Sequence, residues 1–438
     1  MVQFTPTYFT KQLGFVINQL SGAGCDHMGN FPTLPIAGAL RVSPDSILNM
    51  QTPVGKEIGT AGYYAATVDH SIRAELTVTE RTGMARYTFS SKEKQGTVII
   101  GGGVAATPIQ VAAIKITGPH SCEGYAEGGA FCGIPTPYKV YFVAEFDADA
   151  ESFGTWKEER LHANHTFAEG SHSGVYFTFP LKEGNQAVQY KIGVSYVSVE
   201  NARENLRVEN PAWDFSAVRQ ATQDKWNEYL GKIEVEGDNE DRQMQFYTHL
   251  YRSLIHPNVC SDVNGEYMGA DSQVHKTARK FYTSFSNWDT YRTQTALIAM
   301  LAPEETSDIV MSHYLFAEQS GGGFPRWVLA NIETGVMQGD PTPILVANAY
   351  AFGARNYDPR TLLRTMRYGA EVPGANSQGV LTRPGLEQYL EKGYYDASIL
   401  LEYTSSDFAI GRFALQACND EPVCNLSLIH ISEPTRRS

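Results

Sequence analysis

The hydrophobic pattern of this chain changes period near Pro211, and this change constrains the fold more than any other feature. From about residue 35 to 210, short runs such as 75–79 and 140–146 alternate between apolar and polar residues. These runs are rich in β-branched and aromatic residues and are separated by Gly, Pro, Asn and Asp, which is typical of an antiparallel sandwich. The sequence therefore predicts an N-terminal antiparallel β-sandwich domain over residues 1–210.

Beyond Pro211 the apolar residues recur at helical spacing. Asp214 stands where it can cap a helix whose apolar face includes Phe215, Val218 and Trp226. Since this helix would lie between an all-β region and an all-α region, we predict a linker helix over residues 211–236.

Residues 237–425 are predicted to form helices joined by longer polar loops. The helical segments are 243–255, 290–301, 303–318, 341–354, 359–367 and 394–417. Paired helices with polar loops between them indicate a partial (α/α)6 toroid, because these segments are about half of the helices that a complete ring requires. The predicted fold class is therefore multidomain β + α, and the alternative for the second half is an irregular helical domain.

Composition excludes two classes of partner. The net charge of −13, with no cluster of Lys and Arg, argues against nucleic acid, because binding to phosphates needs a positive face. The sequence contains no run of eighteen apolar residues and therefore predicts no membrane span.

The two ends of the sequence are unusual. Residues 1–6 have neither the charged region nor the apolar region of a signal peptide, so we expect the natural start to lie upstream. Residues 427–436 look like a translated sequencing adapter, and we treat 426–438 as a non-native tail. We therefore expect this chain to be a fragment of a longer protein.

The cysteines show no pair with the spacing of a zinc site. Cys122 and Cys132 bracket a glycine-rich stretch that we interpret as a loop. Two arrangements are open for this pair, a local disulfide in an oxidising compartment or buried free thiols.

Residues 281–340 carry the strongest chemical signal. Trp288, Asp289 and Arg292 lie close together at the start of a predicted helix, and Trp327 and Asp340 follow after a glycine-rich turn. Indole rings stack on the C–H faces of sugars, while Asp and Arg side chains hold hydroxyl groups through directed hydrogen bonds. The pattern thus favours a sugar-binding site, and the alternative is a core tryptophan beside a surface ion pair.

The stretch SNWDTYR at 286–292 resembles the S-x-W-D-T-x-R signature of glycoside hydrolase family 92, the calcium-dependent exo-acting α-mannosidases. Further stretches resemble motifs of that family and occur in the same order: 20–25, 246–248 with 256–258, 321–327, 335–340 and 401–408. Gln19 stands where the family more often has His.

The resemblance implies an inverting exo-α-mannosidase in which a calcium ion binds two hydroxyls of the terminal mannose. It implies that Asp289 and Arg292 hold hydroxyls of that mannose, with Asp289 as a helix cap as the alternative. It further implies that Trp288 and Trp327 wall the pocket and that Asp340 lies at it. By the same resemblance Cys25 would close the pocket from the first domain. The alternative is that Cys25 is a small buried thiol.

Other candidate residues are given supporting roles. Glu402 and Asp407, on the last predicted helix, are assigned to packing and to support of the site. His256 and His313 have no ligand-spaced partner, so we interpret both as structural.

Several carboxylates in the helical half could in principle supply the two acid groups of a glycosidase: Asp262, Asp271, Asp289, Glu333, Asp340, Glu402 and Asp407. By resemblance, however, the proton donor, the water-activating aspartate and much of the calcium shell lie beyond residue 425. We therefore expect the catalytic residues and the metal ligands outside this chain and expect the fragment to be inactive.

The predicted function is glycoside hydrolysis, with mannose-containing glycan as the partner and calcium as the cofactor. We expect the full-length protein to be secreted, periplasmic or at the cell surface, which the family and a polymeric substrate both favour. The alternatives are another sandwich-and-toroid carbohydrate enzyme, such as a phosphorylase or a lyase, and a non-catalytic glycan-binding protein.

Overall fold

The computed structural model describes residues 5–6, 14–20, 24–45, 54–183 and 186–417. The chain divides into two compact units. Unit 1 comprises the described residues up to Ile233 together with Ser261–Asn264, and unit 2 comprises Glu234–Cys260 and the described residues from Gly265 onward. The predicted order, an antiparallel β domain followed by a helical domain, is confirmed, whereas the predicted boundaries at residues 210 and 236 stay predictions.

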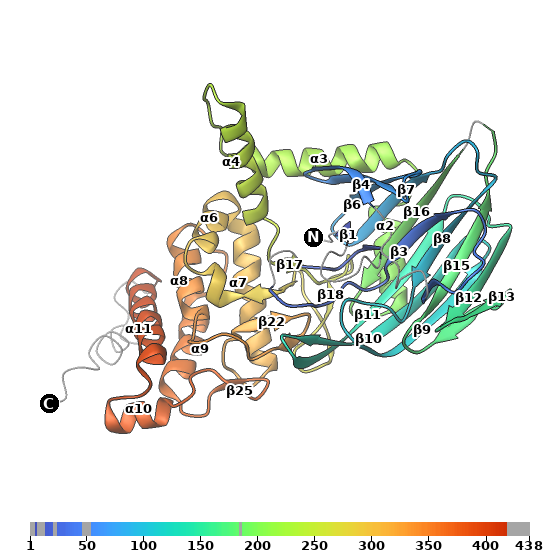
Figure 1. The fold of residues 1–438 in the computed structure, drawn as a ribbon. Coiled ribbons are helices and arrows are strands. Elements are labelled where there is room, and N and C mark those ends of the chain that lie inside the picture. Colours follow the sequence, from blue (N-terminus) through green and yellow to red (C-terminus); the bar gives the residue numbers. More distant parts are fainter. Residues whose placement is uncertain (1–4, 7–13, 21–23, 46–53, 184–185, 418–438) are drawn as a thin grey trace. The chain divides into compact units, whose positions relative to one another are not determined.

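Unit 1 is built from antiparallel strands and two helices (Figure 1). Its strands are β1 Thr5–Pro6, β2 Phe15–Val16, β3 Thr33–Ala37, β4 Val54–Thr60, β5 Tyr63–Val68, β6 Ile72–Val78, β7 Thr82–Thr88, β8 Gln95–Gly101, β9 Ile109–Gly118, β10 Ser121–Phe131, β11 Ile134–Phe146, β12 Ser152–Lys157, β13 Arg160–Ala163, β14 Phe167–Glu169, β15 Ser173–Pro180 and β16 Ala187–Ser195. Its helices are α2 Val199–Glu209 and α3 Phe215–Leu230.

These strands form two sheets within the described residues. One sheet has seven strands in the order β1-β2-β3-β8-β15-β12-β13, and the other has nine in the order β14-β9-β10-β11-β16-β7-β6-β5-β4. Phe146 of β11 packs against Phe177 and Phe179 of β15, with ring centroids 5.0 and 4.9 Å apart, so the apolar faces of the two sheets share a core. This packing is the sandwich arrangement that the alternating pattern predicts.

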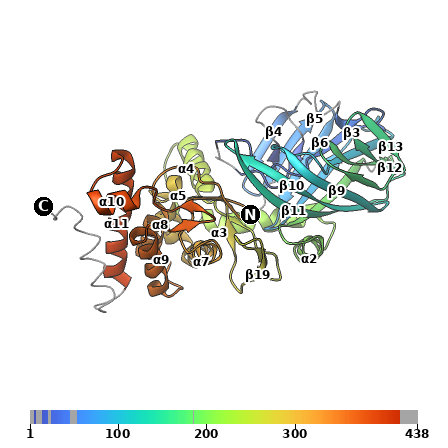
Figure 2. The ribbon, with the colours of Figure 1, turned by 90° about the horizontal axis from the view of Figure 1, so that it is seen from below.

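Helix α2 packs along β16 and β11, on the outer face of the nine-stranded sheet (Figure 2). The sequence analysis did not identify this helix, which begins where the Ser198 hydroxyl accepts a hydrogen bond from the Asn201 N–H at 3.0 Å. Helix α3 begins after Asp214, whose carboxylate accepts from the Ala217 N–H at 3.0 Å, as predicted for this cap. Phe215 and Trp226 are its buried residues.

The predicted loop between Cys122 and Cys132 is wrong, because residues 121–131 form strand β10. A strand of this length separates its ends by roughly 30 Å, so a local disulfide cannot form. Cys132 instead pairs with Cys25, which lies 107 residues earlier in the sequence. The alternative interpretation, two buried free thiols, is right for Cys122, which is a buried thiol, and wrong for Cys132.

Unit 2 combines helices with short strands. Its helices are α4 Glu240–Ser253, α5 Asn287–Thr290, α6 Gln294–Leu301, α7 Pro303–Gln319, α8 Thr342–Ala351, α9 Pro359–Glu371, α10 Leu386–Lys392 and α11 Ala397–Ala417. Its strands are β17 Asn258–Val259, β18 Glu266–Met268, β19 Val274–Lys276, β20 Tyr282–Thr283, β21 Phe285–Ser286, β22 Trp327–Leu329, β23 Ile332–Glu333, β24 Asn376–Ser377 and β25 Val380–Leu381.

The main core of unit 2 surrounds α8. Val346 of α8, Leu362 of α9 and Ile410 of α11 are fully buried members of one apolar cluster. The six predicted helical segments correspond to α4, α6, α7, α8, α9 and α11, whereas α5, α10 and the short strands were not predicted. In the part of the chain that is described, no helix has the length and apolar character needed to cross a membrane.

Candidate functional site

The signature segment begins on a small sheet in unit 2. Strand β21 pairs with β22 so that Ser286 lies opposite Trp327 and Phe285 lies opposite Val328. The one-turn helix α5 follows directly and carries Trp288 and Asp289. This register brings together two motifs that the sequence separates, the S-x-W-D-T-x-R segment and the glycine-rich turn that ends at Trp327.

Asn287 is the buried centre of the signature. Its Nδ2 donates to the Pro325 carbonyl at 3.1 Å and to the Thr342 Oγ1 at 2.8 Å, so it ties α5 to the turn and to the start of α8. Its Oδ1 lies 3.0 Å from His313 Nε2. Because the signature varies at this position, sequence reasoning gave Asn287 no role.

His313 is fully buried, as its structural interpretation implies. Burial lowers the pKa of its imidazole to about 4, so the ring is neutral at neutral pH. A neutral imidazole carries a single N–H, whereas the ring faces two acceptors, the Ile309 carbonyl at 2.8 Å and Asn287 Oδ1. The ring therefore donates to one of them at a time, and its stacking on Phe285, with centroids 3.7 Å apart, fixes its position.

Trp288, Asp289 and Arg292 form what we call the exposed trio. Asp289 and Arg292 are exposed and Trp288 is half-buried. The Trp288 Nε1 donates to Glu402 Oε1 at 3.3 Å, and the Arg292 guanidinium lies 5.5 Å from the centroid of the Trp288 ring. Helix α11 thus supplies a second carboxylate next to the indole, and the supporting role predicted for Glu402 stays a prediction.

Asp289 does not occupy the capping position of α5. Ser286 stands there, and its hydroxyl donates to Asp289 Oδ2. Asp289 instead lies in the first turn, where a negative charge is favourable beside the free N–H groups of the helix. Its carboxylate therefore has one short local contact and remains accessible to solvent.

Asp340, Arg383 and Asp407 form a second cluster, which we call the buried triad. Arg383 Nε lies 2.9 Å from Asp340 Oδ2, and its Nη1 lies 2.7 Å from Asp407 Oδ1. The Arg383 and Asp340 side chains are only 1% and 2% exposed, and that of Asp407 is 14% exposed. Burial raises the pKa of both carboxyls, and the Arg383 guanidinium opposes this rise. Asp340 is thus held in an ion pair.

A second buried arginine organises the glycine-rich turn. Arg326 donates to the Gly339 carbonyl at 2.9 Å and to the Thr382 carbonyl at 3.2 Å. Glu333 accepts from the backbone N–H groups of Arg326 at 2.6 Å and of Trp327 at 3.2 Å. Burial raises the pKa of Glu333. The two backbone hydrogen bonds to its carboxylate stabilise the turn, and Trp327 is buried within that turn.

Helix α11 connects the exposed trio with the buried triad. Ser406 donates to the Asp340 carbonyl oxygen, and a Cβ placed on Gly339 would lie 2.8 Å from the Glu402 Cβ. Gly339 also has a φ of +77°, so this position requires glycine for two reasons. The close approach places Glu402 beside the Gly339–Asp340 segment while its carboxylate reaches Trp288.

Two small cavities lie near these residues. One of about 30 Å³ lies behind the signature and is lined in part by His256, Asn287 and Thr290. The other, of about 10 Å³, is lined in part by Arg326, Asp340 and Thr382. Each has room for one or two water molecules and neither can hold a sugar ring.

Cys25, the predicted contribution of the first domain, lies in unit 1 and is half-buried in its disulfide with Cys132. His27 contacts two backbone groups that precede it in the chain: its Nε2 accepts from the Leu20 N–H at 2.9 Å and its Nδ1 donates to the Cys25 carbonyl at 2.6 Å. Burial lowers the pKa of His27, which is consistent with this neutral tautomer. The sequence did not predict the disulfide.

The other candidate carboxylates lie elsewhere. Asp262 is buried in unit 1, and Asp271 lies 3.0 Å from His275 next to the β18–β19 pair. Among the described residues, no three His, Cys, Asp or Glu side chains are grouped so that they could hold a metal ion. We therefore assign no calcium ligand, and the catalytic residues expected beyond residue 425 lie outside the described part of the chain.

Sequence reasoning missed Arg383, Arg326 and Asn287. Arg383 and Arg326 are isolated arginines in polar loops, and no local pattern distinguishes them from surface arginines. No local signal marks them, because Asp340 follows the exposed residues 337–338 and Asp407 follows the exposed residues 404–405. The burial that makes a cation necessary is therefore not visible in the sequence.

Comparison with known proteins gives matches over most of the chain. Residues 7–195 match the glycosyl hydrolase family 92 N-terminal domain, and residues 201–425 match the glycosyl hydrolase family 92 catalytic domain. An uncharacterized secreted glycosidase from Arthroderma benhamiae is 27% identical over 307 residues, which are 62% of this chain and 37% of that protein.

Solved structures show the same fold. A family GH92 α-mannosidase from Bacteroides thetaiotaomicron, also solved in complex with mannoimidazole, is 22% identical with a TM-score of 0.85, over 95% of this chain and 59% of that chain. A family GH92 inverting mannosidase from the same organism is 23% identical with a TM-score of 0.85, over 99% of this chain and 60% of that chain. The chain therefore spans only part of the length of these relatives.

Both halves of the chain match models of one family in the order in which its domains occur, and the fold agrees with structures from that family. The chain belongs to glycosyl hydrolase family 92.

Proposed function

We propose that the protein to which this chain belongs is an exo-acting α-mannosidase that releases terminal mannose from glycans. Family membership makes it a glycoside hydrolase, and two family structures similar to it are an α-mannosidase and an inverting mannosidase. The observation that carries the proposal is the exposed trio. An indole, a carboxylate and a guanidinium are arranged on one accessible part of unit 2, with Glu402 bonded to the indole.

In this proposal Asp289 and Arg292 hold hydroxyls of the terminal mannose and Trp288 packs against its ring. The ionised carboxylate of Asp289 accepts from hydroxyls, and the five N–H donors of Arg292 bind the ring and hydroxyl oxygens. Glu402 holds the indole in place through Nε1. Contacts of Trp327, Asp340 and Cys25 with the sugar stay predictions, and in this structure Trp327 and Asp340 are buried.

The proposal takes calcium and the inverting mechanism from the family resemblance alone. The calcium ligands would lie outside the described residues, so no step is derived through the ion here. The test is chelation: mannoside hydrolysis by the full-length protein should be lost with EDTA and restored by added Ca²⁺. NMR should show the β-anomer of mannose as the first product, and initial release of the α-anomer would contradict inversion.

Secretion of the full-length protein is part of the proposal. The Cys25–Cys132 disulfide supports it, because disulfides persist mainly in oxidising compartments. The name of the fungal relative, a secreted glycosidase, points the same way. Recovery of activity from the medium or periplasm of the source cells tests this expectation, and recovery from the reduced cytosol alone would contradict it.

The decisive assay compares the full-length protein with this chain on an aryl α-mannoside. We expect turnover by the full-length protein and none by the chain itself, because the two acid groups are expected beyond residue 425. Turnover by the chain would contradict that assignment. Binding of mannoside by the full-length protein without turnover would favour the glycan-binding alternative.

A further inference from the structure

Residues 261–264 belong to unit 1, although the residues on both sides of them in the sequence belong to unit 2. The chain leaves unit 1 after Ile233, forms Glu234–Cys260 as part of unit 2, returns for Ser261–Asn264 and leaves again at Gly265. We call residues 261–264 the strap. Since Ser261 and Asp262 are only 2% and 3% exposed, the return is a buried insertion and not a surface crossing.

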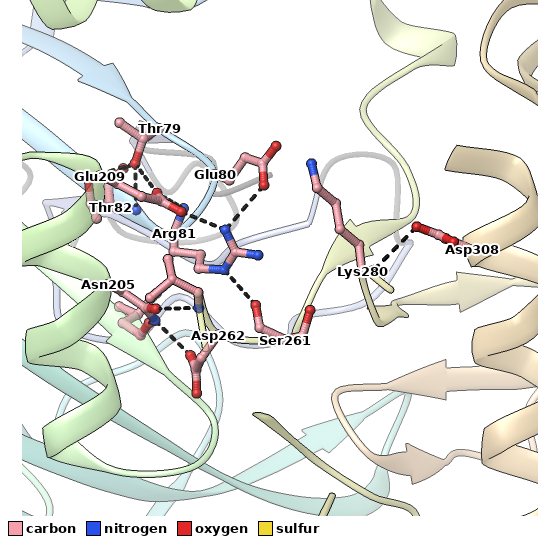
Figure 3. Close-up of polar contacts among 12 residues, drawn as sticks. Thr79, Glu80, Arg81, Thr82, Asn205, Glu209, Ser261, Asp262, Lys280 and Asp308 are labelled. Carbon is pink, nitrogen blue, oxygen red and sulfur yellow. Dashed lines mark hydrogen bonds and ion pairs between the residues drawn. The ribbon is translucent and has the colours of Figure 1, made fainter. Parts of the chain in front are cut away.

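The strap is bonded to unit 1 along its whole length. Arg81 Nε donates to the Ser261 carbonyl at 2.6 Å (Figure 3). The Val263 N–H donates to Asn205 Oδ1 at 2.9 Å, and Asn264 Nδ2 lies 3.5 Å from Asn201 Oδ1. A loop that only passed by would leave most of these groups to water.

Asp262 is the centre of this attachment. Its Oδ2 accepts from Ser195 Oγ at 2.7 Å and from Asn201 Nδ2 at 2.8 Å. Its Oδ1 accepts from Asn205 Nδ2 at 2.6 Å. No basic side chain forms an ion pair with it in the described part of the chain, so neutral donors hold the carboxylate.

Unit 1 holds these donors in place independently of the strap. Asn205 Nδ2 also donates to the Val194 carbonyl at 2.9 Å, and Arg81 Nη1 pairs with Glu209 Oε1 at 2.6 Å. Figure 3 shows the Arg81 guanidinium directed at Glu209, Glu80 and the Ser261 carbonyl. The receptor for the strap is therefore formed by unit 1 itself.

The strap is joined directly to the strands that precede the signature. Cys260, the residue before it, donates its N–H to the Phe281 carbonyl at 2.7 Å. Strand β17 then pairs with β20, with Asn258 opposite Thr283 and Val259 opposite Tyr282. Strand β20 leads within a few residues to Trp288 and Asp289.

We propose that Asp262 is a positioning residue, which by anchoring the strap in unit 1 holds the β17–β20 pair and, through it, the segment that carries Trp288 and Asp289. The role in sugar binding rests on the proposed function. The anchoring itself does not, and it is measured separately below.

The test is hydrogen–deuterium exchange on the chain with Asp262→Asn. Asparagine keeps the shape but places an NH2 group against the donors from Ser195, Asn201 or Asn205, so the strap loses at least one charged hydrogen bond. We expect exchange of the Cys260 and Val263 amides to accelerate by about tenfold to a hundredfold. We expect a smaller acceleration at the β17–β20 pair. The matched control is Asp224→Asn, an exposed aspartate on α3, which should change neither.

Unchanged exchange at Cys260 and Val263 in the Asp262→Asn variant would overturn the proposal. Equal acceleration throughout the sheets of unit 1 would also overturn it, because Asp262 would then stabilise the unit in general and not the strap. If Asp262→Asn does not fold, Asn201→Ala removes one of the three donors to Asp262 together with the longer contact from Asn264, and it should give the same local pattern with a smaller amplitude.

Activity of the full-length protein provides the second readout. If the proposed function is right, Asp262→Asn should raise KM for an aryl α-mannoside or lower kcat, while Asp224→Asn should leave both unchanged. Faster exchange with no mannosidase activity in the wild type would leave the anchoring intact and contradict the proposed function. Faster exchange with unaltered kcat and KM would restrict the role of Asp262 to the strap and overturn its link to Trp288 and Asp289.

Discussion

The exposed trio and the buried triad contain the same kinds of side chain in opposite surroundings. In the trio, Asp289 and Arg292 face solvent and do not pair with each other within the described residues, whereas in the triad Asp340 and Asp407 share one buried guanidinium. The sequence marks Asp289 and Asp340 as equivalent candidates for sugar binding. In the structure the Asp289 carboxylate is exposed and accepts a hydrogen bond from Ser286, whereas the triad links α11 to the Gly339–Asp340 segment.

The largest effect should come from removing the cation of the triad. Arg383→Met leaves two buried carboxylates without a partner, so we expect the free energy of unfolding to fall by about 3–5 kcal/mol. Urea denaturation of the variant measures this change. The control is Arg412→Ala on the exposed side of α11, which should stay within about 0.5 kcal/mol. Equal losses of unfolding free energy in Arg383→Met and Arg412→Ala would contradict the stabilising role of the buried arginine.

The buried histidine below the signature should give the next largest effect, through pH. The folded-state pKa of His313 is lowered from 6.5 to about 4, so between these values the unfolded state binds more protons than the folded state. Stability contributed by the neutral ring is therefore fully present above pH 6.5 and is lost as pH falls towards 4. The loss amounts to about 3 kcal/mol.

Denaturation curves of wild type and His313→Gln at several pH values test this. The difference between the two free energies of unfolding should change across this pH window, and an exposed control, His165→Gln, should give a curve parallel to the wild type. If the His313→Gln curve is also parallel, His313 does not titrate in the assigned way.

The two tryptophans of the signature region sharpen the comparison on a smaller scale. Trp327→Phe leaves a space in a fully packed turn and should cost about 2 kcal/mol of stability. Trp288→Phe removes the bond to Glu402 and makes a half-buried ring smaller, and it should cost about 0.5–1 kcal/mol. Thermal unfolding of both variants measures the difference. A larger loss of stability for Trp288→Phe than for Trp327→Phe would contradict the assignment of the packing role to Trp327.

The smallest effect on stability should come from the trio itself. Asp289→Asn keeps the shape of an exposed side chain, so the free energy of unfolding should change by no more than about 0.5 kcal/mol. Asp340→Asn, the matched change in the triad, should cost clearly more. A large loss of stability in Asp289→Asn would assign this aspartate to the framework.

Much of this fold could be predicted because its patterns are local. The alternation in 140–146 and the cap at Asp214 are set by neighbouring residues, and both appear in the structure. The helices that the sequence predicts are those with long apolar patterns. Helix α2 was missed because it begins on Asn-rich, charged sequence and is stabilised by packing on the nine-stranded sheet.

The parts that were missed depend on contacts between distant residues. The Cys25–Cys132 pairing depends on how β10 runs, and the glycines of β10 had been interpreted as a loop. The burial of Asp340 depends on Arg383, which lies 43 residues later in the sequence. The pairing of Ser286 with Trp327 brings the two tryptophan motifs together, but the sequence could not tell that Asp289 is exposed while Trp327 is buried.

The central claim is that the exposed trio binds the terminal mannose, and the most direct measurement is kcat/KM of the full-length protein for an aryl α-mannoside with Asp289 or Arg412 replaced. Loss of one charged hydrogen bond to the sugar predicts that Asp289→Asn lowers kcat/KM by about tenfold to a hundredfold, while Arg412→Ala leaves it unchanged. An Asp289→Asn variant that folds normally and hydrolyses the mannoside as fast as the wild type would contradict the account.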